Sequence, residues 1–477
     1  MTSTDSLALS AAATSNGRDL LTTGTFGVIN PATGEVFAQA PSVTPDQLDD
    51  VFDAAQNAYL SWRIDDEYRR DALRRAADVI ESRTAELAPI LTFEQGKPLA
   101  DSTLEFNLAA TWLRYYADLD VPRQIIRDDA QGFEEVVRRP LGVVSAITPW
   151  NVPIALAMWK IAPALRAGNT IVVKPSPYTP LATLALANIL RGTFPDGVLN
   201  VVTGPDPLGE AMVSHPIPRK VSFTGSTSVG RKVALGAADD LKRVTLELGG
   251  NDPAIILGDV DVDAIAPSLF RSAFANNGQI CLAVKRVYAH ESIQPRLVEA
   301  LSEIARSVKV DEGTVDGAVL GPINNKPQYE RVKDLVADAV SNGARATAGG
   351  KPIDRDGYFH QPTILDQVHD GMRIVDEEQF GPALPIISFR DEADAIVRAN
   401  RSEYGLTASV WSGDADHAAQ LAPQIEAGQV SINMHGGGVR PHLPFGGHKH
   451  SGVGVENGPW GLHGFTELQV IAGPSRQ

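Results

Sequence analysis

The chain has 477 residues, enough for two large domains or about three of average size. Its 43% hydrophobic and 21% charged residues are typical of a soluble globular protein. The net charge of −16 argues against nucleic acid or an anionic membrane as a partner, since both bind basic surfaces, and no apolar run is long enough for a membrane helix.

The single cysteine, Cys281, cannot form an intrachain disulfide and fits a reducing compartment. The N-terminus carries an acid and no base before its short apolar stretch, unlike a secretory signal. We therefore expect a cytoplasmic protein, with the first twenty or so residues forming a loose tail. The sequence gives no reason to expect a metal site.

Beyond this tail, residues 30–35 predict a turn between two short strands. A helix follows, with Thr44 as its N-cap, Pro45 in its first turn and Gln47 completing a capping box. Apolar residues recur at helical spacing up to Trp62. A second helix is predicted from about Arg69 to Gly96.

From residue 140, short apolar runs alternate with helical segments, which predicts βαβ units and a parallel sheet covered on both faces. The strands are expected at 143–147, 170–173, 198–202, 221–224 and 244–248. Helices are expected at 154–165, 181–190, 208–213 and 229–237. This is a dinucleotide-binding type of architecture, which alone names no reaction.

A second α/β series begins after Gly250. Its helices are expected near 262–274, 295–307, 329–342 and 391–400, and its strands at 254–257, 286–290, 384–388, 408–411 and 430–433. Residues 124–139 are predicted to be extended, and residues 466–472 to form a strand. A strand at the C-terminus needs a partner, and another subunit is one possible source.

Two segments of the first series predict ligand contacts. Gly225 and Ser226 follow a strand and open a helix, where small residues and free N–H groups suit a phosphate, although Thr227 occupies the second glycine position of the usual fingerprint. Lys174 ends a parallel strand, where side chains face the ligand crevice. A purely structural turn and a solvated surface lysine are the alternatives.

The chain also carries a possible nucleophile and a possible base. Cys281 lies in the run Asn-Asn-Gly-Gln-Ile-Cys, 34 residues after Glu247 in Leu-Glu-Leu-Gly-Gly. A thiol together with a carboxylate that deprotonates water is the minimum for covalent acyl chemistry. A lone cysteine in such a protein is otherwise a buried, inert residue.

Taken together, these runs resemble the aldehyde dehydrogenase superfamily over roughly residues 25–475. The order of the motifs and the spacing between Glu247 and Cys281 match the family. The matching stretches are 148–151 (TPWN), 159–165 (WKIAPAL), 174–176 (KPS), 223–226 (FTGS), 246–250 (LELGG), 278–281 (GQIC), 377–382 (EEQFGP), 444–447 (PFGG) and 449–452 (KHSG).

The resemblance implies a catalytic role for three residues. Cys281 would attack the aldehyde carbonyl, and the amide of Asn151 with the backbone N–H of Cys281 would stabilise the alkoxide. Hydride transfer would leave a thioester, which water activated by Glu247 would hydrolyse. Lys160 belongs to a family motif and has either a functional or a structural role.

The resemblance also implies an NAD cofactor. Lys174 would reach the adenosine ribose, Gly225 and Ser226 the pyrophosphate, and Glu378 with Phe380 the nicotinamide end. One departure concerns Pro177, because many NAD-preferring members have a glutamate there that would repel a 2′-phosphate. NADP is therefore expected to be accepted too. The predicted cofactor-binding residues are Ile147, Thr148, Pro149, Trp150, Lys174, Ser176, Pro177, Gly225, Ser226, Leu248, Glu378 and Phe380.

The small-molecule aldehyde is expected to contact Val152, Trp159 and Phe445. Val152 replaces an aromatic residue found in many members, which would widen a tunnel with apolar walls. We therefore predict medium-sized apolar or aromatic aldehydes as substrates in preference to charged semialdehydes. His435 is expected to be a loop residue.

The implied fold is α/β, with two Rossmann-like α/β domains and a small β oligomerisation extension. We expect a dinucleotide-binding domain over residues 1–120 and 140–246, a catalytic domain over 247–440, and an extension from 121–139 and 441–477. The extension implies a homodimer or a homotetramer. A CoA-acylating dehydrogenase and a catalytically silent protein on the same fold are the alternatives, and the presence of Glu247, Cys281 and Asn151 argues against both.

Overall fold

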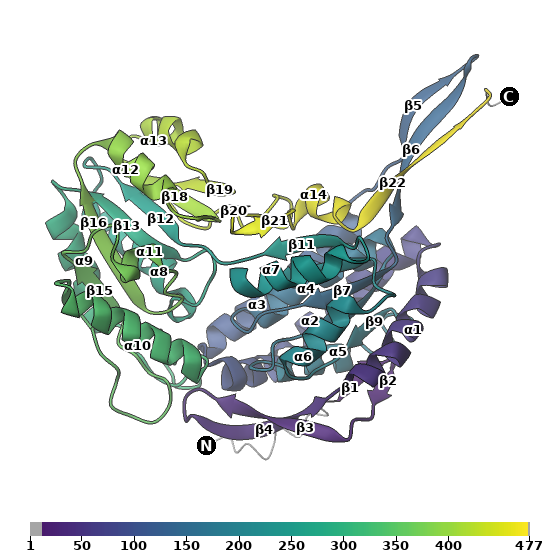
Figure 1. The fold of residues 1–477 in the computed structure, drawn as a ribbon, viewed down its shortest axis with the longest axis horizontal. Helices are drawn as coiled ribbons and strands as arrows, with labels where there is room; N and C mark the ends of the chain where they lie inside the picture. Colours follow the sequence, from purple (N-terminus) through teal and green to yellow (C-terminus); the bar gives the residue numbers. More distant parts are fainter. Residues whose placement is uncertain (1–11, 476–477) are drawn as a thin grey trace.

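The computed structural model describes residues 12–475, which form two α/β units and a projecting β arm (Figure 1). The first unit contains an eight-stranded sheet. Its strands, in spatial order, are β2 (Arg18–Leu20), β1 (Ala13–Ser15), β9 (Leu199–Val201), β8 (Thr170–Lys174), β7 (Val143–Ile147), β10 (Lys220–Thr224), β11 (Arg243–Glu247) and β21 (Gly452–Val453).

The strands from β9 to β11 are parallel, and the chain runs outward from β7 in both directions, first through β8 and β9 and then through β10 and β11. The strand order therefore reverses between β7 and β10. Ligands of open α/β sheets bind at the carboxyl ends of the strands at such a point. The segments that follow Ile147 and Thr224 leave the sheet there.

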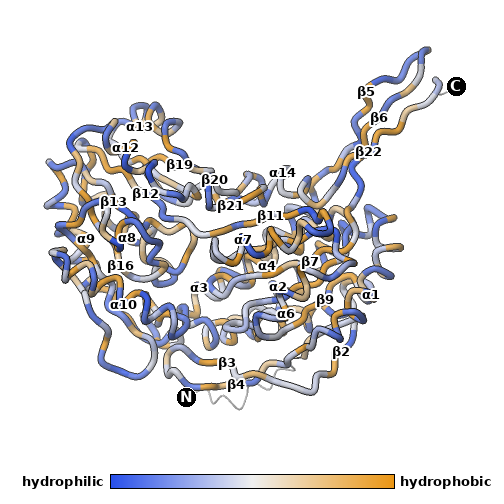
Figure 2. Tube along the Cα trace, in the orientation of Figure 1, coloured by the Kyte–Doolittle hydropathy of each residue, from blue (hydrophilic) through white to orange (hydrophobic). Residues whose placement is uncertain are grey.

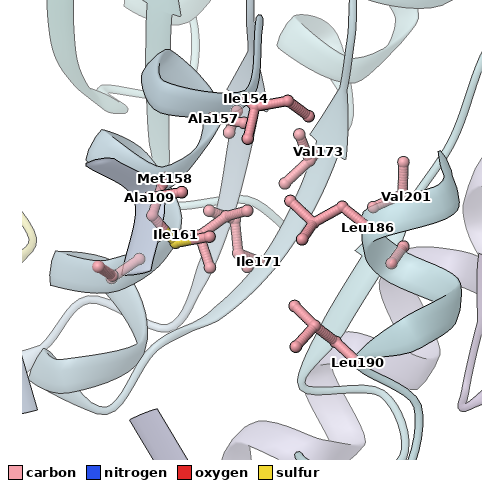
Figure 3. Packing of buried hydrophobic residues seen from close by; sticks show 14 of the residues in the cluster. Ala109, Ile154, Ala157, Met158, Ile161, Ile171, Val173, Leu186, Leu190 and Val201 are labelled. Atoms are coloured by element: carbon pink, nitrogen blue, oxygen red, sulfur yellow. The ribbon is translucent and has the colours of Figure 1, made fainter. Parts of the chain in front are cut away.

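Helices enclose this sheet. They are α1 (Pro45–Trp62), α2 (Asp66–Gln95), α3 (Leu99–Asp118), α4 (Pro153–Ala167), α5 (Leu181–Ile189), α6 (Asp206–Ser214) and α7 (Thr227–Ala238). Every residue of α4 is buried. Figure 3 shows Ile154, Met158 and Ile161 of this helix near Ile171 of β8 and Leu186 of α5. This apolar core fixes the start of α4 next to the carboxyl ends of the strands.

The second unit contains a seven-stranded sheet whose central strands are parallel. Its order is β14 (Arg345–Ala348), β15 (Thr363–Asp366), β16 (Ala383–Phe389), β13 (Val284–His290), β12 (Asp252–Ile256), β18 (Thr407–Trp411) and β19 (Gln429–Ile432). The helices after β12 are α8 (Val262–Phe274), α9 (Gln294–Ser307), α10 (Lys326–Ser341), α11 (Arg373–Asp376), α12 (Glu392–Asn400), α13 (Ala415–Leu421) and α14 (Gly458–His463). The expected pair of Rossmann-like α/β units is confirmed.

The arm is a three-stranded antiparallel sheet of β22 (Thr466–Gly473), β6 (Gly132–Pro140) and β5 (Gln124–Asp129), and it projects from the body (Figure 1). β22 pairs with β6 of the same chain over eight residue pairs, so the C-terminal strand does not need another subunit as its partner. The apolar side chains of Ile125, Ile126, Leu468 and Val470 are exposed on the arm, which carries apolar stretches in Figure 2.

Two smaller pairs complete the strands: β3 (Gly24–Asn30) with β4 (Glu35–Ser42), and β17 (Tyr404–Gly405) with β20 (His448–Lys449). The predicted turn at residues 30–35 and the helix after Thr44 are confirmed. The Oε1 atom of Gln47 accepts a hydrogen bond from the Thr44 N–H at 3.1 Å, as the capping box requires.

Two expectations about the N-terminal part were wrong or incomplete. The prediction of a loose tail is wrong for residues 13–20, because these residues form β1 and β2, which extend the sheet. The Thr14 hydroxyl accepts a hydrogen bond from the Val201 N–H at 3.0 Å. Residues 1–11 of the predicted tail lie outside the described residues. Helix α3 was not predicted, although its buried residues Phe106, Ala109, Ala110, Leu113 and Ala117 follow helical spacing.

Between residues 12 and 475, no helix is both long and apolar enough to span a membrane. The same residues contain no group of three or more His, Cys, Asp or Glu side chains arranged to hold a metal ion.

Candidate active site

The nucleophile candidate Cys281 lies in the loop between α8 and β13. Asn276, Asn277 and Gly278 just before it have φ angles of 50°, 60° and 72°, a left-handed run that is unusual for non-glycine residues. Hydrogen bonds hold this turn, including one of 3.0 Å from the Gln279 Nε2 to the Asn276 carbonyl. Strained backbone of this kind persists where the surroundings determine it, often at functional sites.

Burial raises the pKa of the Cys281 thiol to about 12. The Lys285 charge opposes this effect, whereas Asp252, Glu247 and Glu378 act in the same direction as burial. A nucleophilic cysteine works as the thiolate. The charges around the thiol therefore decide whether it reacts at neutral pH.

Glu247 is the last residue of β11 and is buried. Neither carboxylate oxygen has a hydrogen-bond partner within the part of the chain that the structure describes. Burial holds its pKa well above the usual range, and the Glu456 carboxylate adds to the shift while the Lys160 ammonium opposes it. A raised pKa makes the ionised carboxylate a stronger proton acceptor, which suits a general base.

Glu247 and Cys281 are brought together by the Gly249–Gly250 segment that joins the two sheets. A Cβ atom on Gly250 would lie 2.8 Å from the Cys281 carbonyl oxygen, and one on Gly249 would lie 2.4 Å from an oxygen of Glu378. These positions therefore require glycine because of close approach. The same segment holds the base, the nucleophile loop and Glu378 against one another.

Asn151 lies just before α4, and its side chain is buried. One hydrogen of its Nδ2 is donated to the Gln279 carbonyl at 2.9 Å, which leaves the second hydrogen available for a substrate oxygen. The Asn151 carbonyl accepts hydrogen bonds from Lys97 Nζ and from Asn276 Nδ2, both at 2.9 Å. These contacts fix Asn151 against the nucleophile loop.

The predicted cofactor residues of the first sheet lie at the carboxyl ends of its parallel strands. Ile147 ends β7, Lys174 ends β8, and the Thr148 N–H donates to the Lys174 carbonyl at 3.0 Å. Ser226 caps α7, accepting a hydrogen bond from the Val229 N–H at 3.4 Å.

The polar groups at these strand ends fit a dinucleotide. Within residues 12–475 the buried hydroxyl of Thr148 has no hydrogen-bond partner. The side chain of Lys174 is buried at the end of β8. Burial lowers the pKa of Lys174 to about 8, and Asp206 opposes this shift. Ser176 and Pro177 follow in the turn after β8, and Leu248 packs on Gly230 at the start of α7.

The remaining cofactor candidates come from both units. The Glu378 carboxylate accepts a hydrogen bond from the Gly250 N–H at 3.0 Å, and burial raises its pKa against the opposing charge of Lys285. The rings of Trp150 and Phe380 are in edge-to-face contact at 5.3 Å. Pro149 lies half-buried beside Trp150.

The three substrate candidates lie on the apolar side of the nucleophile. Val152 is half-buried and, like Cys281, packs against the core of the first unit. Trp159 is 6% exposed, stacks on Trp112 at 5.6 Å and contacts Phe445 edge-to-face at 5.1 Å. These rings form one aromatic cluster, to which α4 contributes Trp159.

Sequence reasoning left several polar residues of the site unidentified. Glu456 accepts a hydrogen bond from Lys160 at 2.5 Å in a fully buried pair, and Lys160 also donates to Thr224 at 2.7 Å. Lys97 pairs with Glu105 at 2.6 Å. His435 is a loop residue as predicted, but its ring is buried and bonds the Leu282 carbonyl at 2.8 Å.

The fold and these residues define an α/β protein with a half-buried thiol and a buried carboxylate between two doubly wound sheets. Residues 21–471 match the family model described as "Aldehyde dehydrogenase family". The chain belongs to the aldehyde dehydrogenase family.

Curated relatives cover nearly the whole chain. The chain is 37% identical over 454 residues to "Succinate-semialdehyde dehydrogenase [NADP(+)] GabD" of Escherichia coli, covering 93% of each chain. It is 39% identical over 466 residues to the phenylacetaldehyde dehydrogenase of Pseudomonas fluorescens, covering 94% of this chain and 92% of the relative.

A solved structure shows the same fold. The NAD+ complex of the aldehyde dehydrogenase from Bacillus cereus superposes with a TM-score of 0.95 at 35% identity, covering 98% of this chain and 96% of that chain.

Proposed function

We propose that this protein oxidises an aldehyde to the carboxylic acid with NAD+ or NADP+ and without CoA. The proposal rests on the buried carboxylate of Glu247, which has no hydrogen-bond partner among residues 12–475. The Gly249–Gly250 segment holds it against the loop of Cys281. An acyl-accepting thiol next to a buried base suits hydrolysis of a thioester.

In the proposed reaction the Cys281 thiolate adds to the aldehyde carbon. The free hydrogen of Asn151 Nδ2 and the Cys281 backbone N–H donate to the oxygen as it becomes negative. The nicotinamide, when bound, supplies the acceptor for the hydride that leaves this carbon. Glu247 then takes a proton from water, whose oxygen attacks the thioester carbon. The carbon–sulfur bond breaks to release the acid, and the proton passes from Glu247 to the Cys281 sulfur, which restores the carboxylate and the thiol.

For the cofactor, we propose binding at the strand ends around Lys174, Thr148 and Ser226, with Glu378 and Phe380 at the nicotinamide end. The relatives support both NAD+ and NADP+. Pro177 offers no carboxylate to repel a 2′-phosphate, so we propose that both cofactors are used and that NAD+ is the main one.

For the substrate, we propose medium-sized apolar or aromatic aldehydes. The apolar residues around the nucleophile, including Val152, and the aromatic cluster of Trp159 and Phe445 support this class. Phenylacetaldehyde dehydrogenase and semialdehyde dehydrogenases are both among the relatives.

An aldehyde panel with NAD+ or NADP+, followed at the absorbance of the reduced nicotinamide, tests these proposals. Turnover of benzaldehyde or a mid-length alkanal without CoA supports them. A charged semialdehyde turning over a hundredfold more efficiently would refute the substrate class, and activity that appears only with CoA would refute hydrolysis by Glu247. Silence with and without CoA would favour an unusual substrate or a catalytically silent protein.

We further propose a homodimer or homotetramer in the cytoplasm, assembled through the arm. The open edges of β22 and β5 and the exposed Leu468 and Val470 support an intersubunit contact there. We retain the domain division proposed from the sequence: 1–120 with 140–246, then 247–440, and 121–139 with 441–477. Within the last part, however, β21 joins the sheet of the first unit.

A further inference from the structure

Lys285 is a buried lysine beside the nucleophile loop. It lies near the start of β13, and its side chain is only 3% exposed. Its Nζ donates to the carbonyls of Cys281 at 2.7 Å, Ile280 at 2.9 Å and Ala283 at 3.3 Å. An ammonium has three donors and no acceptor, so all three of its hydrogens are used on one short stretch of backbone.

The bond to the Ile280 carbonyl has a direct geometric consequence. The Ile280 C=O and the Cys281 N–H belong to the same planar trans peptide and point in opposite directions. The Ala283 N–H donates to the same carbonyl at 3.0 Å, and together with Lys285 it holds this oxygen on one side, so the Cys281 N–H is turned to the other side of the loop. Donation to the carbonyl also polarises the peptide and strengthens its N–H as a donor.

Lys285 also supplies a positive charge next to the nucleophile loop, and this charge lowers the pKa of Cys281. Its Nζ lies 3.7 Å from Glu378 Oε1 and 5.9 Å from the centre of the Phe380 ring. The other ionisable groups acting on this region are the carboxylates of Asp252 and Glu247, the buried ring of His435 and, through Glu378, Arg331. The ammonium therefore opposes three carboxylates around Cys281.

We propose that Lys285 is a positioning residue for the nucleophile: it orients the Ile280–Cys281 peptide so that the Cys281 N–H faces the substrate oxygen, and its charge stabilises the Cys281 thiolate. Glu378 partly neutralises this charge, which links the nicotinamide end of the site to the reactivity of the thiol. The first part rests on the proposed function, whereas the effect on the thiol does not.

The test uses the full chain and iodoacetamide, because Cys281 is the only thiol in the protein. The alkylation rate is measured against pH for the wild type, Lys285→Gln and Lys285→Arg, without aldehyde or cofactor. From about pH 6 to 9 the rate follows the thiolate fraction. Lys285→Gln, which loses the charge, is expected to slow alkylation about tenfold throughout this range, which corresponds to an upward pKa shift of about one unit. Lys285→Arg should stay within about twofold of the wild-type rate, since it retains the charge.

The matched control is Lys242→Gln. Lys242 is also buried and donates to a backbone carbonyl, that of Val213 at 2.9 Å, but its ion-pair partner is Asp240 and it makes no contact with the nucleophile loop. Its loss should leave the alkylation rate unchanged. An unchanged rate in Lys285→Gln, or an equal decrease in the control, would overturn the role of the charge.

The Glu378→Gln variant is a test that does not depend on the stability of the lysine variants. It removes a carboxylate that neutralises the Lys285 ammonium and that also raises the pKa of Cys281 directly, so alkylation should become faster. A rate that stays the same or falls would contradict the proposal. In turnover, Lys285→Gln should lower kcat about 10- to 100-fold with less change in KM, as expected when an oxyanion donor is misplaced. A changed KM with unchanged kcat would overturn the positioning of the Cys281 N–H.

Discussion

The buried ion pair of Lys97 and Glu105 is expected to hold Asn151 in place, and Lys97→Met tests this. The pair is only 4% and 3% exposed, with its atoms 2.6 Å apart. Glu105 also accepts hydrogen bonds from the N–H groups of Ile154 at 2.7 Å and Ala155 at 3.1 Å, at the start of α4. The carboxylate thus joins α3 to the helix that follows Asn151.

Methionine keeps most of the volume of the lysine but leaves the Glu105 charge buried without a cation. Removing one partner of such a pair costs about 3–5 kcal/mol. The Asn151 carbonyl also loses one of its two donors, so the amide that we propose for the substrate oxygen becomes less well placed. We expect the free energy of unfolding to fall by about 3–5 kcal/mol and kcat to fall at least about tenfold.

Chemical denaturation at pH 7 and steady-state kinetics measure both effects. The double variant Lys97→Met/Glu105→Gln removes the buried charge and should recover more than half of the lost stability, leaving a cost of about 1–2 kcal/mol. The control Lys333→Met breaks an exposed pair with Glu330 and should cost less than about 1 kcal/mol. A single variant within about 1 kcal/mol of the wild type, or a double variant no more stable than the single, would refute the reasoning.

Three further predictions concern buried carboxylates and the thiol. Cys281→Ala should abolish aldehyde oxidation while cofactor binding, measured by calorimetry, stays within twofold; full turnover would refute the mechanism. Glu456→Gln removes a charge that raises the pKa of Glu247, so the pH–rate profile of thioester hydrolysis should rise at lower pH than in the wild type; a shift to higher pH would contradict this. Burial raises the pKa of Glu94 to about 8 from an ordinary value of 4.5, so the stability it contributes is greatest below pH 4.5 and is lost as pH rises toward 8. As pH rises from 6 to 8, the free energy of unfolding of Glu94→Gln should therefore increase by about 2 kcal/mol relative to that of the wild type. Denaturation midpoints that depend equally on pH in the two proteins would refute this.

The α/β fold was predictable because its strands and helices follow simple patterns. The strands β7, β8 and β10 are short, almost wholly buried segments that contain apolar residues, and the predicted helix after Thr44 begins with a capping box. The β1–β2 pair could not be predicted from such a pattern. It is short, and its place depends on the free edge of β9, which is formed by residues almost two hundred positions later.

The motif residues of the site were predictable from a resemblance, but their electrostatic partners were not. Glu456 lies 296 residues from Lys160 and bonds it at 2.5 Å, and Glu105 caps a helix that begins 48 residues later. No local pattern encodes such pairs, because each side chain alone looks like an ordinary surface charge. Only the folded chain brings them together in a buried site, where charges act most strongly.

The backbone around Cys281 shows why local rules fail at this site. Two consecutive asparagines with positive φ cost free energy, and a lysine buried near the start of a strand costs more unless its donors are satisfied. Hydrogen bonds offset both costs: the Gln279 amide donates to the Asn276 carbonyl, and the Lys285 ammonium donates to three carbonyls. If these groups served only stability, an apolar loop of ordinary conformation would serve as well. Their joint effect is to hold the nucleophile and its peptide N–H in one orientation, which is what stabilising charge on a substrate oxygen requires.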